Sequence, residues 1–256
     1  MRSLHTRAWI VPLVLLLLAP LVALASGADE GVEVRERFTP DRLRAPVNLS
    51  LTARLSPESA IAREPVRRLT VYAPAGLRID ARGAGTCAQA VLERMGPPGC
   101  PIDSRAGFGG GVGVLQLRSQ AVRERYTLDF FFASTRPHSL ALLIYASATA
   151  PVNIQMTIVA HEVQASPPYG IGFSVEVPPI STIPGAEAAS IETAFATLGA
   201  ANVAYYRRIH GHRRLVRVRG LIAPSSCPSG GFPTLAKIQF ASGRLLTLDP
   251  TVPCPS

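Results

Sequence analysis

Two neighbouring runs, Phe130-Phe-Phe132 and Leu140-Ala-Leu-Leu-Ile144, contain only apolar residues. Each run lies within a longer stretch of strand character, 126–133 and 140–146. Successive side chains of a strand point to opposite faces of the sheet, so an unbroken apolar run is apolar on both faces. Strands that are covered on both sides have this composition. We therefore expect these two runs to form the centre of a β-sheet core.

Further strand signals surround this core. In 48–55, Leu49, Leu51 and Leu55 alternate with polar residues, as in a strand with one buried and one solvated face. The chain also contains 23 prolines and 21 glycines, which place turns between short strands. These features predict an all-β fold over residues 48–256, an antiparallel β-sandwich that is jelly-roll-like or built from two packed sheets. The other stretches of strand character are 68–73, 112–117, 154–163, 171–177, 191–198, 215–221 and 236–248.

One short helix is expected near residues 87–95. Thr86 and Gln89 have the spacing of a capping box, and Gly96 supplies a stop. The apolar positions between them form one stripe, which would lie against the sheet. A later Pro-rich run predicts a break that divides the fold into two parts near 178–186, although a loop crossing the edge of a sandwich has the same composition.

The N-terminus has the form of an export signal. Arg2 and Arg7 precede an apolar run at 8–25, and small residues stand one and three positions before the expected cleavage point. We therefore predict a signal peptide at 1–25, a flexible arm at 26–47, and a secreted or extracytoplasmic protein. Because the run is also long enough to span a membrane, an uncleaved segment that anchors the protein is the alternative.

Export bounds the classes of function. The formal net charge is +9, with 26 Lys and Arg against 17 Asp and Glu. In an exported protein such a charge is not expected to serve nucleic-acid binding. The sole tryptophan, Trp9, lies in the predicted signal peptide, which disfavours carbohydrate recognition on a broad aromatic platform. No cofactor is expected.

The four cysteines, Cys87, Cys100, Cys227 and Cys254, are expected to form disulfides in an oxidising compartment. Three pairings are formally available. We favour Cys87 with Cys100 and Cys227 with Cys254, since a short helix and a return turn can bring the first pair together. Each bridge would stabilise the fold by about 3–4 kcal/mol in the chain-entropy account. A reactive thiol at Cys87, activated by the helix N-terminus, is the alternative.

Four short motifs stand out: Gly83-Ala-Gly-Thr-Cys87, Cys100-Pro-Ile-Asp-Ser104-Arg-Ala-Gly107, Val177-Pro-Pro-Ile-Ser-Thr-Ile-Pro-Gly185 and Cys227-Pro-Ser-Gly-Gly-Phe232. Together they resemble uncharacterised secreted β-rich proteins of GC-rich actinobacteria. The resemblance implies a β-rich, exported protein, and it implies no activity.

The densest polar cluster of the sequence spans 205–219. If 213–219 is a strand, Arg213, Leu215, Arg217 and Arg219 share one face. Guanidinium groups in a row repel one another unless an anion covers them, so the row predicts contact with an anionic cell-envelope polymer or lipid surface. A solvated edge strand whose charges prevent aggregation has the same pattern. The candidate contact residues are Arg207, Arg208, Arg213, Arg214, Arg217 and Arg219.

Chemistry is weakly indicated elsewhere. His210 and His212 supply two ligands, which are too few for a metal, so no metal site is predicted. The sequence has no Gly-x-Ser-x-Gly elbow, and no catalytic residues are predicted. We expect an exported, non-catalytic binding or structural protein of the cell envelope. The alternatives are a secreted hydrolase with a non-motif active site that uses His161 or His138, and a membrane-tethered ectodomain.

Overall fold

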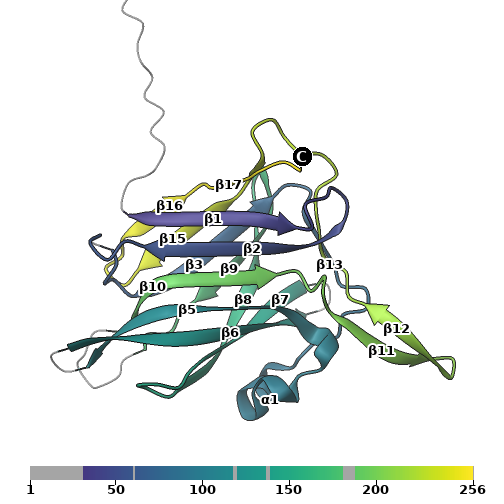
Figure 1. Cartoon of the computed structure of the whole chain (residues 1–256), viewed down its shortest axis with the longest axis horizontal. Helices are drawn as coiled ribbons and strands as arrows, with labels where there is room; N and C mark the ends of the chain where they lie inside the picture. Colours follow the sequence, from purple (N-terminus) through teal and green to yellow (C-terminus); the bar gives the residue numbers. More distant parts are fainter. Residues whose placement is uncertain (1–30, 60, 118–119, 137–138, 181–187, 256) are drawn as a thin grey trace, which may run out of the picture.

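The computed structural model describes residues 31–255 apart from 60, 118–119, 137–138 and 181–187, and the predicted signal peptide at 1–25 lies outside the described residues (Figure 1). No helix in the described part is long and apolar enough to cross a membrane. The strands are β1 (Val32–Thr39), β2 (Pro46–Leu55), β3 (Val66–Pro74), β4 (Arg78–Asp80), β5 (Arg105–Leu117), β6 (Gln120–Arg136), β7 (Ser139–Ala148), β8 (Ile154–Gln164), β9 (Tyr169–Glu176), β10 (Ser190–Leu198), β11 (Ala204–Ile209), β12 (His212–Arg217), β13 (Gly220–Ile222), β14 (Phe232–Pro233), β15 (Leu235–Phe240), β16 (Leu245–Leu248) and β17 (Thr251–Val252), and the helices are α1 (Gln89–Met95), η1 (Pro97–Gly99) and η2 (Ile102–Ser104).

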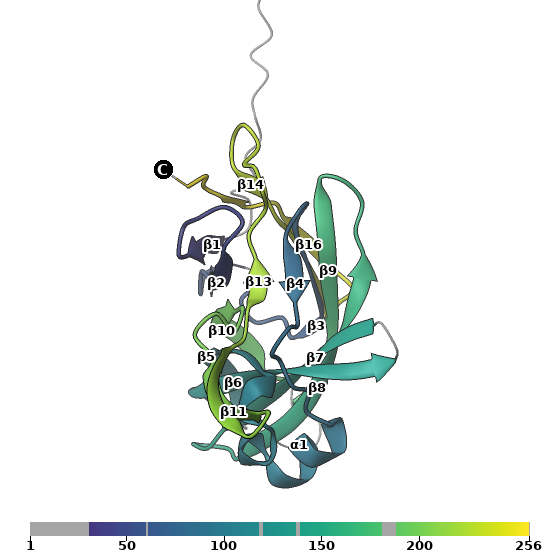
Figure 2. The ribbon, with the colours of Figure 1, turned by 90° about the vertical axis from the view of Figure 1, so that its right-hand side faces the viewer.

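One antiparallel sheet of 13 strands dominates the fold. Its order is β16-β15-β3-β9-β8-β7-β6-β5-β10-β2-β13-β4. The strand β1 lies beside this path and pairs with residues 48–55 of β2. The sheet bends back on itself, so that β2, β10 and β5 form one layer and β3, β9 and β8 form the other (Figure 2). The predicted all-β, sandwich-like fold is therefore confirmed, and both of its layers belong to one continuous sheet.

The fold has no division near 178–186. Strands from both sides of that stretch share the sheet, because β10 pairs with β5 and β2, and β15 pairs with β3. The prediction of two parts is wrong for this reason. The Pro-rich run belongs to the connection between β9 and β10.

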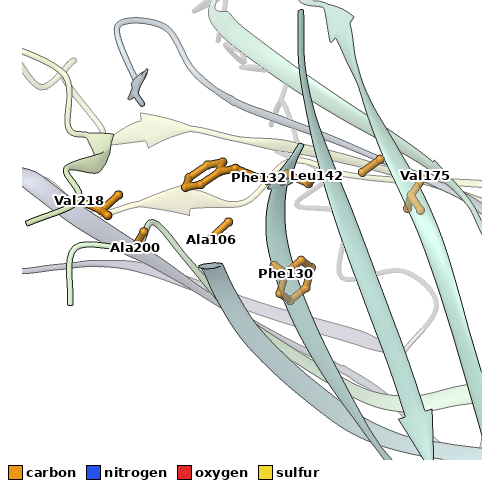
Figure 3. Packing of buried hydrophobic residues seen from close by; sticks show 8 residues of the cluster. Ala106, Phe130, Phe132, Leu142, Val175, Ala200 and Val218 are labelled. Atoms are coloured by element: carbon orange, nitrogen blue, oxygen red, sulfur yellow. The ribbon is translucent and has the colours of Figure 1, made fainter. Parts of the chain in front are cut away.

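The central strands β6 and β7 are covered on both faces, as the apolar runs predict. Phe130, Phe132 and Leu142 face the inside of the bent sheet (Figure 3). Phe131 and Leu143 face the other way and are almost completely buried. These two residues belong to a cluster on the outer face of the sheet that also contains Leu92 of α1 and both cysteines of the first disulfide.

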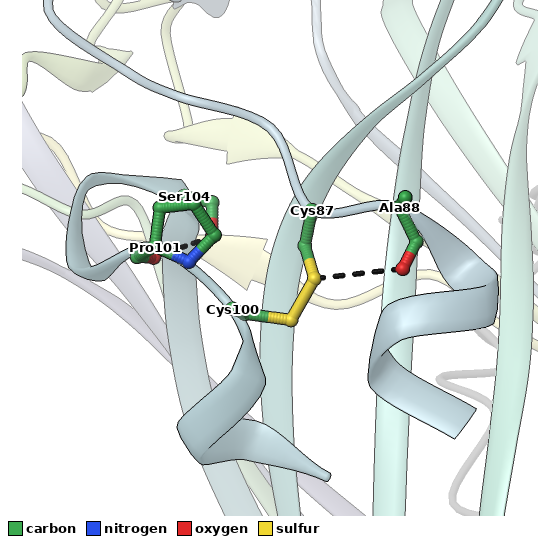
Figure 4. Close-up of a disulfide and its surroundings, with 5 residues drawn as sticks. All are labelled: Cys87, Ala88, Cys100, Pro101 and Ser104. Atoms are coloured by element: carbon green, nitrogen blue, oxygen red, sulfur yellow. Dashed lines mark hydrogen bonds between the residues drawn. A yellow bond between two sulfur atoms is a disulfide. The ribbon is translucent and has the colours of Figure 1, made fainter. Parts of the chain in front are cut away.

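Both disulfides have the pairing favoured by the sequence. Cys87 is joined to Cys100, with 5.2 Å between the Cα atoms (Figure 4), and Cys227 is joined to Cys254, with 5.7 Å. The first bridge joins the two ends of the segment that contains α1 and η1, which packs on the outer face of the sheet, and the second ties the C-terminal tail to the loop between β13 and β14. Two disulfides indicate an oxidising, extracytoplasmic environment.

The helix begins later than a capping box requires. Ala88 is the N-cap residue of α1, and no side chain caps the helix. The backbone amide of Cys87 instead donates to the carbonyl of Phe132 at 2.8 Å. The strand β6 therefore holds this segment extended up to Ala88, and the capping prediction for Thr86 is wrong.

The flexible arm predicted at 26–47 is wrong where the structure describes it. Val32–Thr39 form β1, which pairs with β2 along its length. Val32, Val34 and Phe38 point inward, an alternation that charged neighbours hide in the sequence. Phe38 packs edge-on against Phe232, with 5.5 Å between ring centroids, so the N-terminal strand and the C-terminal segment share one cluster.

Glu36 is the one inward residue of β1 that is charged in solution. Burial raises the pKa of its carboxyl, and a hydrogen bond from Thr234 partly opposes that rise. Thr234 lies 2.7 Å from Glu36 Oε2 and 3.0 Å from the Pro250 carbonyl, but its hydroxyl has a single proton to donate. The Thr234 hydroxyl therefore lies between two acceptors, Glu36 Oε2 and the Pro250 carbonyl.

We therefore expect Glu36→Gln to stabilise the fold in a pH-dependent way. An acid whose pKa is raised by folding keeps its proton longer than the unfolded chain does, so the free energy of unfolding falls as pH rises above 4.5 through the raised pKa. Glutamine keeps a side-chain oxygen that can accept from Thr234 and carries no charge. Urea unfolding should find the two proteins similar at a pH of about 4 and the variant more stable at about 7, whereas the exposed control Glu33→Gln should show no such trend. A difference that shrinks as pH rises would contradict this assignment.

Candidate functional site

The arginine cluster folds as a separate hairpin. The strands β11 and β12 pair only with each other and project from one end of the sheet (Figure 1). His210 and Gly211 form the two-residue turn, and both have positive φ, 50° and +79°. Such a turn matches the twist of a hairpin. His210 is therefore a residue of the hairpin turn. The described residues contain no group of three His, Cys, Asp or Glu side chains arranged to hold a metal ion.

The register places like charges directly opposite one another. Arg207 faces Arg214, and Arg208 faces Arg213 across the hairpin. All four side chains are exposed. Like charges in directly opposed positions destabilise a hairpin, so an anion that binds there would relieve the repulsion.

The two faces of the hairpin differ. Arg208, Arg213 and Arg217 share one face with Tyr206 and Leu215, whose side chains are 59% and 48% exposed. The Arg213 guanidinium lies over the Tyr206 ring at 4.1 Å. This face, which we call the Tyr206 face, combines cationic and apolar groups. Within β12 the structure confirms that Arg213, Leu215 and Arg217 lie on one side.

The opposite face holds the hairpin on the body of the protein. Tyr205 donates a hydrogen bond to the Gly83 carbonyl at 2.8 Å, and Val216 lies against the backbone of Gly83. Arg207 and Arg214 also lie on this face but nearer the turn. The hairpin is therefore anchored at its base, and its tip extends outward.

Arg219 lies beyond the end of β12 and has an acidic partner. Its guanidinium is 3.4 Å from Asp80, which also pairs with Arg82 at 2.6 Å. Chiefly through the hydrogen bond from Arg82, the pKa of Asp80 is lowered to about 2. Arg219 is thus paired with a carboxylate and does not continue the row of arginines.

A second candidate site, which the sequence did not predict, lies inside the bent sheet. A cavity of about 370 Å³ separates the two layers. Its walls come from the inward faces of β2 to β10, and they are almost entirely aliphatic and aromatic. This size falls within the range of small-molecule sites, roughly 300–1,000 Å³. The representative wall residues are Leu51, Leu128, Ile144, Ile158, Phe173 and Ala196.

The inward side chains of the middle strands do not fill the space between the layers. Leu128, Ile144, Ile158 and Phe173 are only partly buried, although they point toward the interior. Their outward neighbours Phe131 and Leu143, beneath α1, are fully buried. The space is therefore a cavity with apolar walls that solvent can reach.

One end of the cavity carries polar groups. Glu124, Tyr126, Ser147 and Ser190 are the polar residues of the wall. Tyr126 donates its hydroxyl proton to the Thr193 carbonyl at 3.0 Å, and burial raises its pKa far above the usual value. The cavity thus has a long apolar part and a small polar end.

Glu124 is the least satisfied of these groups. It is 4% exposed. Its Oε1 accepts a bond from the Val152 amide at 3.3 Å, and its Oε2 has no hydrogen-bond partner among the described residues. The sequence does contain a signal for it, because Glu124, Tyr126, Leu128 and Phe130 are spaced by two and must share a face.

The hydrolase alternative rests on His161 and His138, of which only His161 is described, and it lies outside both sites. His161 is exposed on β8, and His138 lies outside the described residues. The hydrolase hypothesis stays a prediction.

Comparisons with protein-family models, with curated proteins and with solved structures found no match for this chain. The class that the fold and the cavity define is an antiparallel, sandwich-like β protein with an apolar internal site.

Proposed function

We propose that this chain is an exported, non-catalytic binding protein that holds the apolar chain of a lipid-like ligand between the two layers of its bent sheet. The observation that carries the proposal is the cavity of about 370 Å³ with apolar walls. Aliphatic walls make no directed contacts, so they accept a flexible alkyl chain readily. The phenylalanine rings in the wall add apolar contact area and no hydrogen-bonding group.

The energetic argument supports an occupant. An empty apolar cavity costs about 24 cal/mol per Å³. A cavity of about 370 Å³ that stayed empty would therefore carry a large penalty. Water that enters the space makes few hydrogen bonds with such walls. An alkyl chain removes that cost, because it restores the missing van der Waals contacts.

Decan-1-ol, as a simple alkyl ligand, should bind and raise the melting temperature. At about 100 times the dissociation constant it should add about 2.7 kcal/mol of stability, or about 5–10 °C for a domain of this size. Ala146→Phe should weaken both effects, because Ala146 lines the cavity and a phenyl ring there takes up part of its volume. Gln155→Phe places the same ring at an exposed position of β8 and should leave binding intact. Equal binding by the two variants, measured by titration calorimetry, would argue against the cavity as the site.

A second function is favoured by the Tyr206 face of the hairpin. We propose that this face contacts an anionic lipid surface at the cell envelope. Arg208, Arg213 and Arg217 supply positive charge, and the exposed Tyr206 and Leu215 supply apolar groups that can enter the headgroup region. A soluble anionic polymer would use the arginines and leave the apolar pair exposed.

The paired variants Arg208→Ala/Arg213→Ala and Arg207→Ala/Arg214→Ala test this face. Each removes two opposed arginines from the same hairpin. The first should weaken binding to phosphatidylglycerol vesicles by roughly 2 kcal/mol, at about 1 kcal/mol for each arginine near the surface. The second should weaken it less, and added salt should weaken binding for all. Cosedimentation measures the effect, and equal losses, or binding to soluble polyphosphate alone, would overturn the proposal.

A further inference from the structure

The carboxylate of Glu124 occupies a position that the fold itself does not satisfy. The side chain is 4% exposed, in the wall at the polar end of the cavity. Only Oε1 has a partner, the Val152 amide at the long distance of 3.3 Å. Oε2 has none among the described residues. A buried charged group without partners is strongly unfavourable, so such a group calls for a compensating ligand.

The residues next to Glu124 do not supply the missing hydrogen bond to Oε2. Tyr126, two residues along the same face, directs its hydroxyl proton to the Thr193 carbonyl. The ion pair of Arg123 with Glu192, at 2.6 Å, holds the adjacent cation outside the cavity. Gly113 stands opposite Glu124 in the register with β5 and places no side chain beside it. Among the described residues, no donor lies within hydrogen-bond distance of Glu124 Oε2.

We propose that Glu124 binds the hydrogen-bond-donating head group of the cavity's ligand, and that this ligand is a long-chain amphiphile with an ammonium or hydroxyl group. This inference rests on the proposed function, because it assigns the apolar chain to the aliphatic part of the cavity. The head group then lies at the polar end and donates to Oε2. Charge complementarity ranks an ammonium above a hydroxyl, and both above a carboxylate, which would repel Glu124.

A set of ligands with equal chains separates head-group recognition from chain binding. Decylammonium, decan-1-ol and decanoate present a charged donor, a neutral donor and an anion on the same alkyl chain. For the wild-type protein, calorimetric titration should give the order decylammonium, decan-1-ol, decanoate, with roughly 10-fold or more between the first and the last. This ranking needs no variant.

The Glu124→Gln variant removes the charge and keeps the size of the side chain. We expect it to lower the affinity for decylammonium roughly 10-fold or more and to raise that for decanoate. The matched control is Glu58→Gln, which removes one carboxylate from an exposed turn away from the cavity. It should change none of the three affinities appreciably.

The outcomes distinguish the two proposals. If no ligand binds the wild-type protein, both are overturned. If all three bind equally, or if decanoate binds most tightly, the role of Glu124 is overturned while chain binding stands. If the Glu124→Gln variant does not fold, the wild-type ranking decides alone.

Discussion

The fit between the glycine backbone of β5 and the aromatic side chains of β6 determines the shape of the sheet. A Cβ atom at Gly109 would lie 2.4 Å from the Phe195 carbonyl oxygen, and one at Gly111 would lie 1.9 Å from that of Thr193. Only glycine permits β10 to pair with β5 this closely. Tyr126 lies opposite Gly111 in the register and covers the bare backbone. Glycines in a strand interior allow sharp bending, and an aromatic neighbour restores the lost packing. The bend brings β3, β9 and β8 to face β2 and β10, and everything inside depends on it.

Besides the cluster between its layers, the bent sheet has three further hydrophobic clusters. One cluster lies beneath α1 and the Cys87–Cys100 bridge, another joins β1 to the C-terminal segment, and a third lies under β15 and β16. The interior positions include small residues such as Ala146 and Ala196, which leave space between the layers. The three outer clusters hold the layers and the C-terminal segment without filling the interior. The inner cluster lines the cavity itself, so Phe130, Phe132 and Leu142 belong to both the core and the cavity wall.

The sequence predicts individual strands from local composition. It does not predict contacts between distant segments or the spacing between the two layers. The runs at 130–132 and 140–144 predict central strands because composition alone reports coverage on both faces. The strand at Val32–Thr39 escapes notice because its charged outward residues dominate the composition, and the paired state of Arg219 depends on Asp80, which is distant in sequence. The inward apolar pattern is the same whether two layers meet or stay apart, so it cannot distinguish a filled core from a cavity. Glu124 could have been placed on the inward face by its spacing from Phe130, but its missing partner is visible only in three dimensions.

The partly buried Glu36 and the buried Glu124 show why one carboxylate is assigned to structure and the other to ligand binding. Glu36 accepts a hydrogen bond from the Thr234 hydroxyl at 2.7 Å, and burial raises its pKa. Its surroundings are complete without anything further. Glu124 has one long bond from the Val152 amide, an unused oxygen, and a cavity before it. A purely structural carboxylate would be expected to find a second donor during folding, as most buried polar groups do. The absence of a donor among the described residues, together with an apolar space large enough for an alkyl chain, is the combination that an amphiphilic ligand completes.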